Sequence, residues 1–509
     1  MKRGLIFYLV LLIFGFISTI HANNYTSKTT FVVQPIFRPT SPEMISIRRE
    51  RLRMEDEERR FSFDVIPFGG STLGEDDLAK YFLPFGKTEI LVGELGSLAV
   101  KQNTADAIAN YFGILTSGLY TVGAPVNGTL NNYTFQSKLS FKPKQTYGGV
   151  VLSYKQHLSR HTDRGFWFDV VLPIEHIVNS MNLKEEIITE GGPNGDNPKV
   201  PKPGFVANMK QAFQQSSWKF GKIEGKQSKT GVADLYFRLG YMTVKEETHH
   251  LNSYLGFSAG TGDKVTSELV FEPIIGQNQQ NTFFSGMSAG FRVWSDCEQS
   301  LYYELDICGT LFFANDQTRS FDLKDKSWSR YMWVYLDKTS TTTSPGINVF
   351  TQLVNVDAGT SRDLNSAFIF KNRCVYAELG YHFYSRQAEE VKLTNAWKKG
   401  PAIASIIKNG DFIGGGSSRN NATIKEYLDI GNDTIDGVDT YVEITEADLD
   451  LNSAAHPALI SHAVYFALAY HWDHCTNPKY IGLGTSVEFA TNNAVTQRWM
   501  TWARFGISF

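Results

Sequence analysis

The stretch that decides the fold is Trp499-Met500-Thr501-Trp502-Ala503-Arg504-Phe505-Gly506-Ile507-Ser508-Phe509. Successive side chains of an extended strand point to opposite faces. One face would carry Thr501, Ala503, Phe505, Ile507 and Phe509, and the other Arg498, Arg504, Gly506 and Ser508. A strand with one apolar and one polar face requires two different environments. In a soluble protein a core covers the apolar face, whereas in a membrane barrel lipid covers it and the polar face lines the lumen.

The amino terminus indicates export. Lys2 and Arg3 precede the apolar run 5–14, and Ala22 follows a short polar stretch. This order predicts a secretory signal peptide, residues 1–22, that is cleaved after Ala22. No Cys follows the predicted cleavage site, so a lipid anchor is not indicated.

Composition narrows the class further. Downstream of residue 22 there is no run of 18 or more apolar residues, so a further membrane helix is excluded. A net charge of −3 gives no reason to expect nucleic acid as a partner. The four Cys, at 297, 308, 374 and 475, are too few and too widely spaced for a disulfide framework.

The alternation of the last strand recurs along the chain. Alternating runs cover the ranges 61–66, 135–141, 150–154, 166–172, 235–241, 251–261, 284–294, 301–313, 374–386, 462–473, 480–490 and 498–509. They predict an all-β fold, an antiparallel transmembrane β-barrel of about 12 strands, with 14 as the alternative. The range 329–336 is a weaker strand candidate.

The order of these runs raises a difficulty with loop lengths. Counting back from Phe509, the short connections near 245–250 and 295–299 fall outside the cell, and the long ones near 176–230 and 315–366 fall inside. Outer-membrane barrels show the reverse arrangement. An additional strand near 329–336 would correct it.

The remaining segments are predicted to form helices and loops. Residues 23–60 are expected to form a periplasmic amino-terminal segment, with a charged helix that begins at Pro42. Residues 205–216 are expected to form a short amphipathic helix in an insertion that folds into the pore. The barrel domain is expected to span 61–509, with a long external loop at 389–458.

At this point the chain resembles the Gram-negative outer-membrane β-barrel proteins of the porin type. The likeness rests on the signal peptide, the amphipathic strands from Phe61 onward and a last strand that finishes in an aromatic residue. It implies an assembly signal at Phe505, Ile507 and Phe509, read by the barrel assembly machinery. Arg504 departs from the family, which often has Gly there. The likeness also implies location in the cell outer membrane and contact with its lipid, and it names no solute.

The polar faces of the strands supply the candidate site. The predicted pore-lining residues are Asp234, Arg238, Arg292, Glu304, Asp306, Glu378, His382, Arg386, Glu488, Arg498 and Arg504. Acids and bases balance over the wider inward set, so no ion preference follows from charge. By the same register Leu239 faces lipid and Gly240 the lumen, and an arginine should be tolerated better at Gly240 than at Leu239.

Two local motifs indicate neither a catalytic nucleophile nor a metal site. Gly286-Met287-Ser288-Ala289-Gly290 matches G-x-S-x-G, but the alternation continues past it, whereas a nucleophile elbow needs a helix behind the Ser. His471 and His474 read as strand and turn residues rather than a metal site.

We therefore expect a pore for passive passage of small solutes, without catalytic activity, metal or cofactor. The alternative is a structural or adhesive barrel with a plugged lumen. Oligomer formation, the solute and the pore width stay open.

Overall fold

The structure is a computed structural model. It describes residues 27–32, 34–48, 60–93, 104–114, 135–159, 164–189, 206–336, 343–398, 400–403, 407–408, 411–412, 442–472 and 477–509. The predicted signal peptide, the charged run 49–59 and the pair His474 and Cys475 lie outside these ranges. Helices of the described part are all too short or too polar to cross a membrane.

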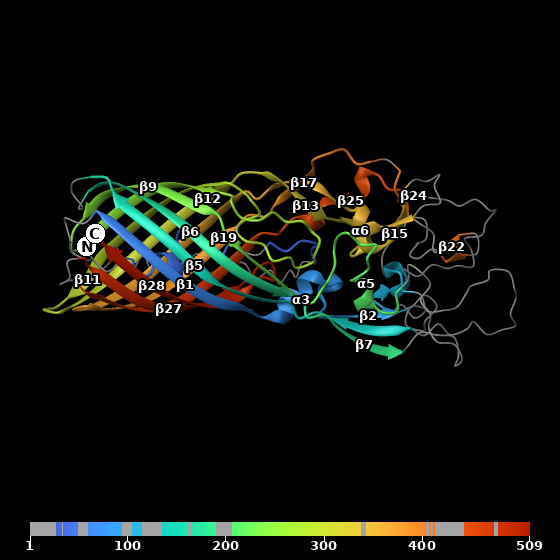
Figure 1. The fold of residues 1–509 in the computed structure, drawn as a ribbon, viewed down its shortest axis with the longest axis horizontal. Coiled ribbons are helices and arrows are strands. Elements are labelled where there is room, and N and C mark those ends of the chain that lie inside the picture. Colours follow the sequence, from blue (N-terminus) through green and yellow to red (C-terminus); the bar gives the residue numbers. More distant parts are fainter. Residues whose placement is uncertain are drawn as a thin grey trace, which may run out of the picture.

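Twelve antiparallel strands form a closed barrel, which confirms the predicted fold class and count (Figure 1). The strands are β1 (Phe61–Leu73), β5 (Lys144–His157), β6 (Gly165–Ser180), β9 (Leu235–Lys245), β10 (His249–Ala259), β11 (Thr282–Ser295), β12 (Gln299–Phe312), β18 (Thr360–Asn372), β19 (Val375–Arg386), β26 (Leu459–Trp472), β27 (Lys479–Ala490) and β28 (Gln497–Ser508). Each pairs with its neighbour along the chain, and β28 closes the barrel on β1.

The barrel resolves the difficulty with loop lengths. Short turns join β9 to β10, β11 to β12 and β18 to β19, at the same end as Phe61 and Phe509. The long connections 74–143, 181–234, 313–359 and 387–458 all lie at the opposite end. Short turns face the periplasm in outer-membrane barrels, so we name the two ends periplasmic and external on that basis.

Two of the strand predictions were wrong, and their errors cancelled in the count. The run 135–141 contains β4 (Gln136–Ser140), which belongs to a small sheet outside the barrel. The missing barrel strand is β18, and its absence reversed the predicted loop order. The weaker candidate at 329–336 forms a 3-10 turn, Ser329–Tyr331, and the short β15 (Trp333–Tyr335), both outside the barrel.

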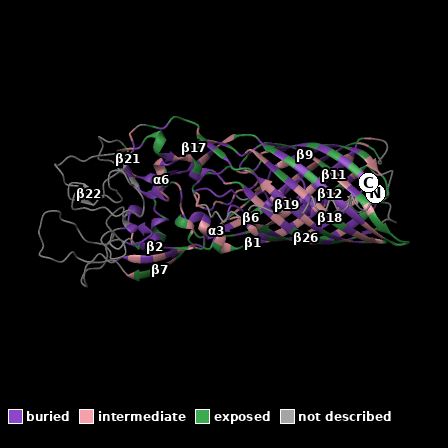
Figure 2. Cartoon of the chain, turned by 180° about the vertical axis from the view of Figure 1, so that it is seen from behind, coloured by how far each residue is buried: buried purple, intermediate pink, exposed green. Residues whose placement is uncertain are grey.

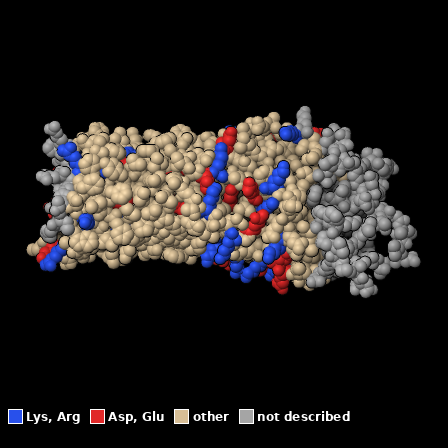
Figure 3. Space-filling model, in the orientation of Figure 1, with Lys and Arg blue, Asp and Glu red and all other residues tan. Residues whose placement is uncertain are grey.

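The outer face of the barrel is apolar. Exposed and buried residues alternate along each strand (Figure 2), and Leu239, Leu255, Leu379 and Leu483 are each more than half exposed. In the space-filling view, charged residues leave a broad band of this surface free and gather near its limits (Figure 3). An apolar surface of this kind is stable in contact with lipid tails, because the lipid shields its side chains from water.

The inner face pairs glycines with aromatic rings. In each case the ring lies directly across from a glycine of the next strand, so that a Cβ on that glycine would overlap the ring. The pairs are Gly70 with Tyr147, Gly149 with Phe68, Gly240 with Trp167, Gly256 with Phe284, Gly286 with Tyr254, Gly380 with Tyr465, Gly484 with Trp502 and Gly506 with Tyr480. A ring laid over the neighbouring glycine covers exposed backbone and fixes the register.

A second body of structure, here called the cap, continues the barrel at its external end (Figure 1). Its sheets are β3-β2-β4-β7, β13-β17-β20, β16-β15-β21-β24, β14-β25 and β22-β23. Their remaining bounds are β2 (Glu89–Gly93), β3 (Ala107–Ile108), β7 (Lys184–Thr189), β13 (Asn315–Ser320), β14 (Asp322–Leu323), β16 (Thr343–Pro345), β17 (Thr351–Asp357), β20 (Glu390–Leu393), β21 (Ala402–Ile403), β22 (Ile407–Lys408), β23 (Asp411–Phe412), β24 (Val442–Glu443) and β25 (Leu449–Asp450). One further strand, β8 (Lys226–Val232), pairs with the external half of β6.

Short helices complete the cap. They are α3 (Glu75–Phe82), α5 (Met209–Ala212) and α6 (Gly346–Val349). Three acidic residues in the first turn of α3 suit the positive end of its dipole, and its apolar side joins an aromatic-rich core. The predicted helix at 205–216 is reduced to α5, and Met209 and Phe213 pack in that core rather than in the pore.

The described part of the amino-terminal segment, residues 27–32 and 34–48, lies in the cap and inside the barrel, whereas the prediction placed it in the periplasm. Thr29 contacts Ser320 and Ser453 of the cap, whereas Ile47 packs with Tyr302 and Tyr480 near the periplasmic turns. The chain therefore passes along the lumen from the cap toward the periplasm. We call residues 34–48 the lumen segment.

The predicted charged helix is described only in part. The structure describes its start, α2 (Pro42–Ile45), which begins at Pro42 as expected, whereas the charged run 49–59 lies outside the described residues. Arg504 of the wall donates hydrogen bonds to the carbonyls of Glu43 and Met44, at 3.0 and 2.8 Å. The Ile47 amide donates to Glu378 instead of to a helical carbonyl, and Ile47 has a φ of 57°. Contacts with the wall thus replace the hydrogen bonds that would extend the helix.

Candidate functional site: the occupied lumen

The lumen segment is buried along its described length. Ile36, Phe37, Met44 and Ile45 are all less than 5% exposed. Phe37 packs edge-on against Phe68 of β1, with ring centroids 4.5 Å apart. The chain's own residues therefore occupy the part of the barrel interior through which the lumen segment runs.

Arg38 makes the main charged contact of the segment with the external half of the wall. Its Nε lies 3.1 Å from Asp363 Oδ1 on β18, and its Nη2 lies 3.8 Å from Glu488 Oε1 on β27. Its guanidinium also lies over the ring of Tyr384, 4.2 Å from the centroid. All four side chains are buried. The three charged groups have lost their contact with water, and their interactions with one another compensate for that loss.

The wall holds these two carboxylates in place. His382 Nε2 contacts the same oxygen of Asp363, at 3.1 Å. Glu488 accepts from Arg498 Nε at 2.5 Å and from the Ser461 hydroxyl at 2.6 Å. The carboxylates are thus oriented by neighbours on β19, β26 and β28.

Further down the lumen, polar contacts continue between segment and wall. Glu378 accepts from the Tyr465 hydroxyl at 2.8 Å and from the Ile47 amide at 3.3 Å. Trp502 Nε1 donates to the Ser46 hydroxyl at 3.1 Å. Wall groups therefore satisfy the backbone and side chain of the segment where it leaves α2.

Arg238 forms a wall-to-wall pair. Its Nε and Nη2 donate to both oxygens of Asp169 on β6, at 2.8 and 2.5 Å. Arg48 of the lumen segment lies 3.4 Å from the same carboxylate. A bidentate pair of this kind is geometrically specific and holds adjacent strands β6 and β9 together.

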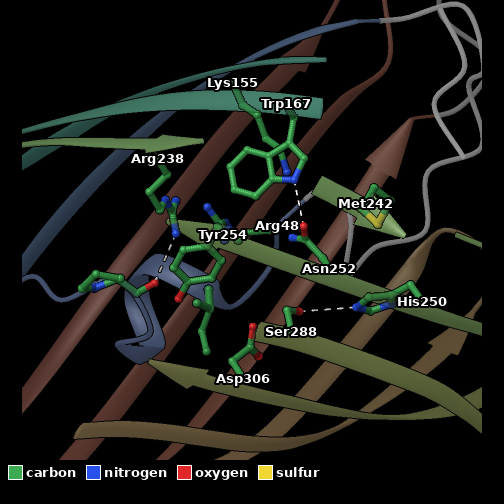
Figure 4. A pocket seen from close by; sticks show the side chains of 12 residues that line it. Arg48, Lys155, Trp167, Arg238, Met242, His250, Asn252, Tyr254, Ser288 and Asp306 are labelled. Atoms are coloured by element: carbon green, nitrogen blue, oxygen red, sulfur yellow. Dashed lines mark hydrogen bonds between the residues drawn. The ribbon is translucent and has the colours of Figure 1, made fainter. Parts of the chain in front are cut away.

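Next to this pair a small cavity, partly open to solvent, lies between the segment and the wall (Figure 4). Lys155 lies over the ring of Trp167, 4.2 Å from its centroid, and Trp167 Nε1 donates to Asn252 at 2.8 Å. Tyr254 and Asp306 complete this part of its lining. The cavity is mixed in character, with aromatic faces beside charged groups.

The G-x-S-x-G serine faces this cavity. Ser288 Oγ lies 3.5 Å from His250 Nε2, and Glu304 Oε2 lies 3.3 Å from the same nitrogen. In a hydrolytic triad the nucleophile and the orienting acid contact opposite nitrogens of the histidine. Ser288 is also embedded in the continuous strand β11, as its alternation predicted.

Most predicted pore-lining residues point inward and are buried. They are Arg238, Glu304, Asp306, Glu378, His382, Arg386, Glu488, Arg498 and Arg504. Asp234 lies just before β9, and its carboxylate accepts a hydrogen bond from the Gly262 amide at 3.3 Å. Arg386 pairs with Glu389 of the cap, 2.8 Å away. Whether any of them lines an ion path stays a prediction.

Arg292 lies elsewhere than expected. It sits near the periplasmic end of β11, at a register shift, and pairs with the exposed Glu247 at 2.5 Å. It is therefore a rim residue and not a member of the central lumen.

Sequence reasoning missed the residues that the lumen segment and β18 contribute. Asp363 was overlooked together with its strand, and Arg38 lies outside any alternating run. A basic residue in an apolar stretch close to the predicted cleavage site was the one available signal. The described residues contain no group of three or more metal-ligating side chains.

Comparisons with known proteins find the barrel but no close relative. No family model and no curated protein matches the chain. An outer-membrane channel from Pseudomonas putida F1 is 9% identical, with a TM-score of 0.38, over 90% of this chain and 98% of the other. The transport unit of the autotransporter AIDA-I from Escherichia coli is 6% identical (TM-score 0.32; 90% and 92% covered). A FadL homologue from Pseudomonas aeruginosa is 9% identical (TM-score 0.27; 95% and 97% covered).

Likeness at this level says nothing about solutes or mechanism. The class of protein is instead defined by the closed barrel of 12 strands, its apolar outer band and its short turns at one end. These features define a transmembrane β-barrel of the bacterial outer-membrane type.

Proposed function

We propose that the protein is a gated outer-membrane channel for small solutes, closed in this conformation by its own lumen segment. The observation that carries the proposal is the course of residues 34–48 along the inside of the barrel. A barrel of 12 strands has room inside beyond its own side chains. Here a separate piece of chain takes up that room.

The contacts of the segment suit a gate. Beside its apolar packing, the segment makes polar interactions, such as Arg38 with Asp363 and Arg504 with the Glu43 and Met44 carbonyls. Such contacts can be exchanged for water or for polar groups of a solute. Displacement of the segment would leave the polar inner face of the barrel exposed to water, as a channel requires.

The test replaces the lumen segment without removing its anchors. A variant carries a Gly/Ser stretch of equal length in place of residues 34–48, and keeps residues 27–32 in the cap core. In planar bilayers we expect the native protein to be closed for most of the time and the variant to conduct steadily. Heat-modifiable migration on gels checks that both proteins form barrels.

A control variant separates a gate from a general loss of packing. Phe85→Ser alters an exposed residue of the cap and should conduct as the native protein does. If the Gly/Ser variant folds and still does not conduct, the channel proposal fails. That result would favour the second candidate, a structural or adhesive barrel, for which the cap with its own aromatic core is the supporting feature.

A further inference from the structure

The wall site that receives Arg38 has the composition of a guanidinium receptor. It combines two carboxylates, from Asp363 and Glu488, with the face of the Tyr384 ring. Carboxylates accept the N–H groups at the edge of a guanidinium, and an aromatic face contacts its plane. The two carboxylates approach different nitrogens of Arg38, and the ring lies under its central carbon.

The side chains that orient the two carboxylates belong to the wall. Asp363 is held by His382, and Glu488 by Ser461 and Arg498. With Arg498 counted against Glu488, the wall keeps one negative charge in excess, which Arg38 neutralises. Removal of Arg38 therefore leaves a buried anionic site that requires a cation.

Arg238 and Arg504 differ from Arg38 in the origin of their partners. Arg238 pairs with Asp169 from strand to strand within the wall. Arg504 reaches from the wall to backbone carbonyls of the segment. Arg38 is different because the segment supplies the cation and the wall supplies the receptor.

We propose that Asp363, Glu488 and Tyr384 form a binding site for solutes that carry a guanidinium group, and that Arg38 occupies it as a tethered surrogate. The inference rests on the proposed gated channel. A guanidinium solute that competes with Arg38 would release the external half of the lumen segment. The site thereby defines both the class of solute and the event that begins opening.

The test is a binding titration of the full-length protein in detergent. In Arg38→Ala the receptor is vacant, and ethylguanidinium should bind saturably in isothermal titration calorimetry. Two matched ligands identify the chemistry: ethylurea has a similar shape without charge, and ethylammonium has the charge without the planar fork. We expect no saturable binding of ethylurea and binding of ethylammonium weaker by about tenfold or more. The native protein, with Arg38 in place, should bind ethylguanidinium much more weakly than the variant.

A second variant locates the site. Arg38→Ala combined with Asp363→Asn should lose the binding of ethylguanidinium, because the retained Glu488 is already paired with Arg498. If Arg38→Ala does not form a barrel, Arg38→Gln takes its place in the same titrations. Equal binding of ethylurea, or no saturable binding of ethylguanidinium to a folded variant, would overturn the inference.

The channel measurement separates this inference from the proposed function. Conductance of the Gly/Ser variant without ethylguanidinium binding to Arg38→Ala would retain the channel and overturn the guanidinium site. Binding to Arg38→Ala with no conductance in the Gly/Ser variant would retain the site and overturn the channel.

Discussion

Single residues of this barrel are constrained by space as much as by polarity. Gly240 faces the lumen, as the alternation predicts, but the Trp167 ring fills the volume next to it. The expectation that an arginine is tolerated better at Gly240 than at Leu239 stays a prediction, but Gly240 has no free space for a larger side chain beside this ring. The register identified the face correctly, and only the packing shows that the face has no room.

This leads to a prediction about two glycines. Gly240→Ala should lower the free energy of unfolding by about 1–3 kcal/mol, because the Trp167 ring has to move. Gly309→Ala should change it by less than about 0.5 kcal/mol, because nothing lies within 4 Å of the added Cβ. Urea titrations of both variants in lipid vesicles provide the measurement, and equal losses at the two positions would contradict it.

Two titratable residues of the cap are strongly perturbed. Burial lowers the pKa of His456 to about 4, although Glu389 acts in the opposite direction. Burial alone would raise the pKa of Glu389, but Arg319 and Arg386 outweigh it and lower that pKa to about 2. His456 also packs against Phe31, just ahead of the lumen segment, with centroids 5.6 Å apart.

We predict that acid loosens the cap in two stages. Between about pH 6.5 and 4 the unfolded chain binds a proton at His456 that the folded cap excludes, so stability falls as pH falls. Below the ordinary pKa of a glutamate, near 4.5, the stabilisation from ionised Glu389 is lost as pH falls toward 2. Proteolysis of the cap as a function of pH measures both stages. His456→Gln should remove the first and keep the second, and an unchanged profile would count against this assignment.

At the scale of elements, the closing seam between β1 and β28 depends on the chain end. Phe509 donates to and accepts from the Phe61 backbone, at 3.0 Å in each direction, and the two rings stack 5.8 Å apart. The implied assembly signal, Phe505, Ile507 and Phe509, lies on the outer face of this strand, and its recognition by assembly machinery stays a prediction.

Deletion of Phe509 should impair barrel formation, because it removes two hydrogen bonds and the ring contact at the seam. Heat-modifiable migration and recovery of protein in the membrane fraction measure the effect. Phe509→Leu keeps the backbone bonds and an apolar side chain, so it should fold better than the deletion. Full recovery of the deleted form would show that the seam closes without this residue.

The elements also show why alternation alone misplaced one strand. In β18, Arg362 lies on the outer face and Ile369 on the inner face, so the polar and apolar positions do not separate. The run 135–141 alternates cleanly because Phe135, Leu139 and Phe141 pack in the cap core. Alternation reports two different environments and does not say whether one of them is lipid.

For the whole molecule, the central question is which residues a passing ion would meet. Arg238 and Arg292 were both predicted to line the pore, but Arg292 pairs with Glu247 at the periplasmic rim. Arg238 lies in the lumen beside the cavity.

In the Gly/Ser variant, Arg238→Gln should therefore shift the reversal potential toward cation selectivity, and Arg292→Gln should shift it less. Charges that line a pore set its preference, and a rim charge is screened by salt. Reversal potentials under a salt gradient provide the measurement. Arg238→Gln with Asp169→Asn removes the pair without changing the charge and should leave selectivity unaltered. A larger shift from Arg292→Gln would contradict the placement of the ion path.

The sequence by itself determined the barrel class and the inward direction of most polar residues, because alternation is a local property of each strand. The predicted strand count agreed with the structure only because one extra strand and one missed strand cancelled. The burial of the lumen segment, the pairing of Arg38 with Asp363 and the glycine–aromatic contacts depend on residues distant in sequence. Only the tertiary structure decides these contacts, because barrel closure brings such residues together and an alternating pattern records only which face a side chain takes, not what fills the space in front of it.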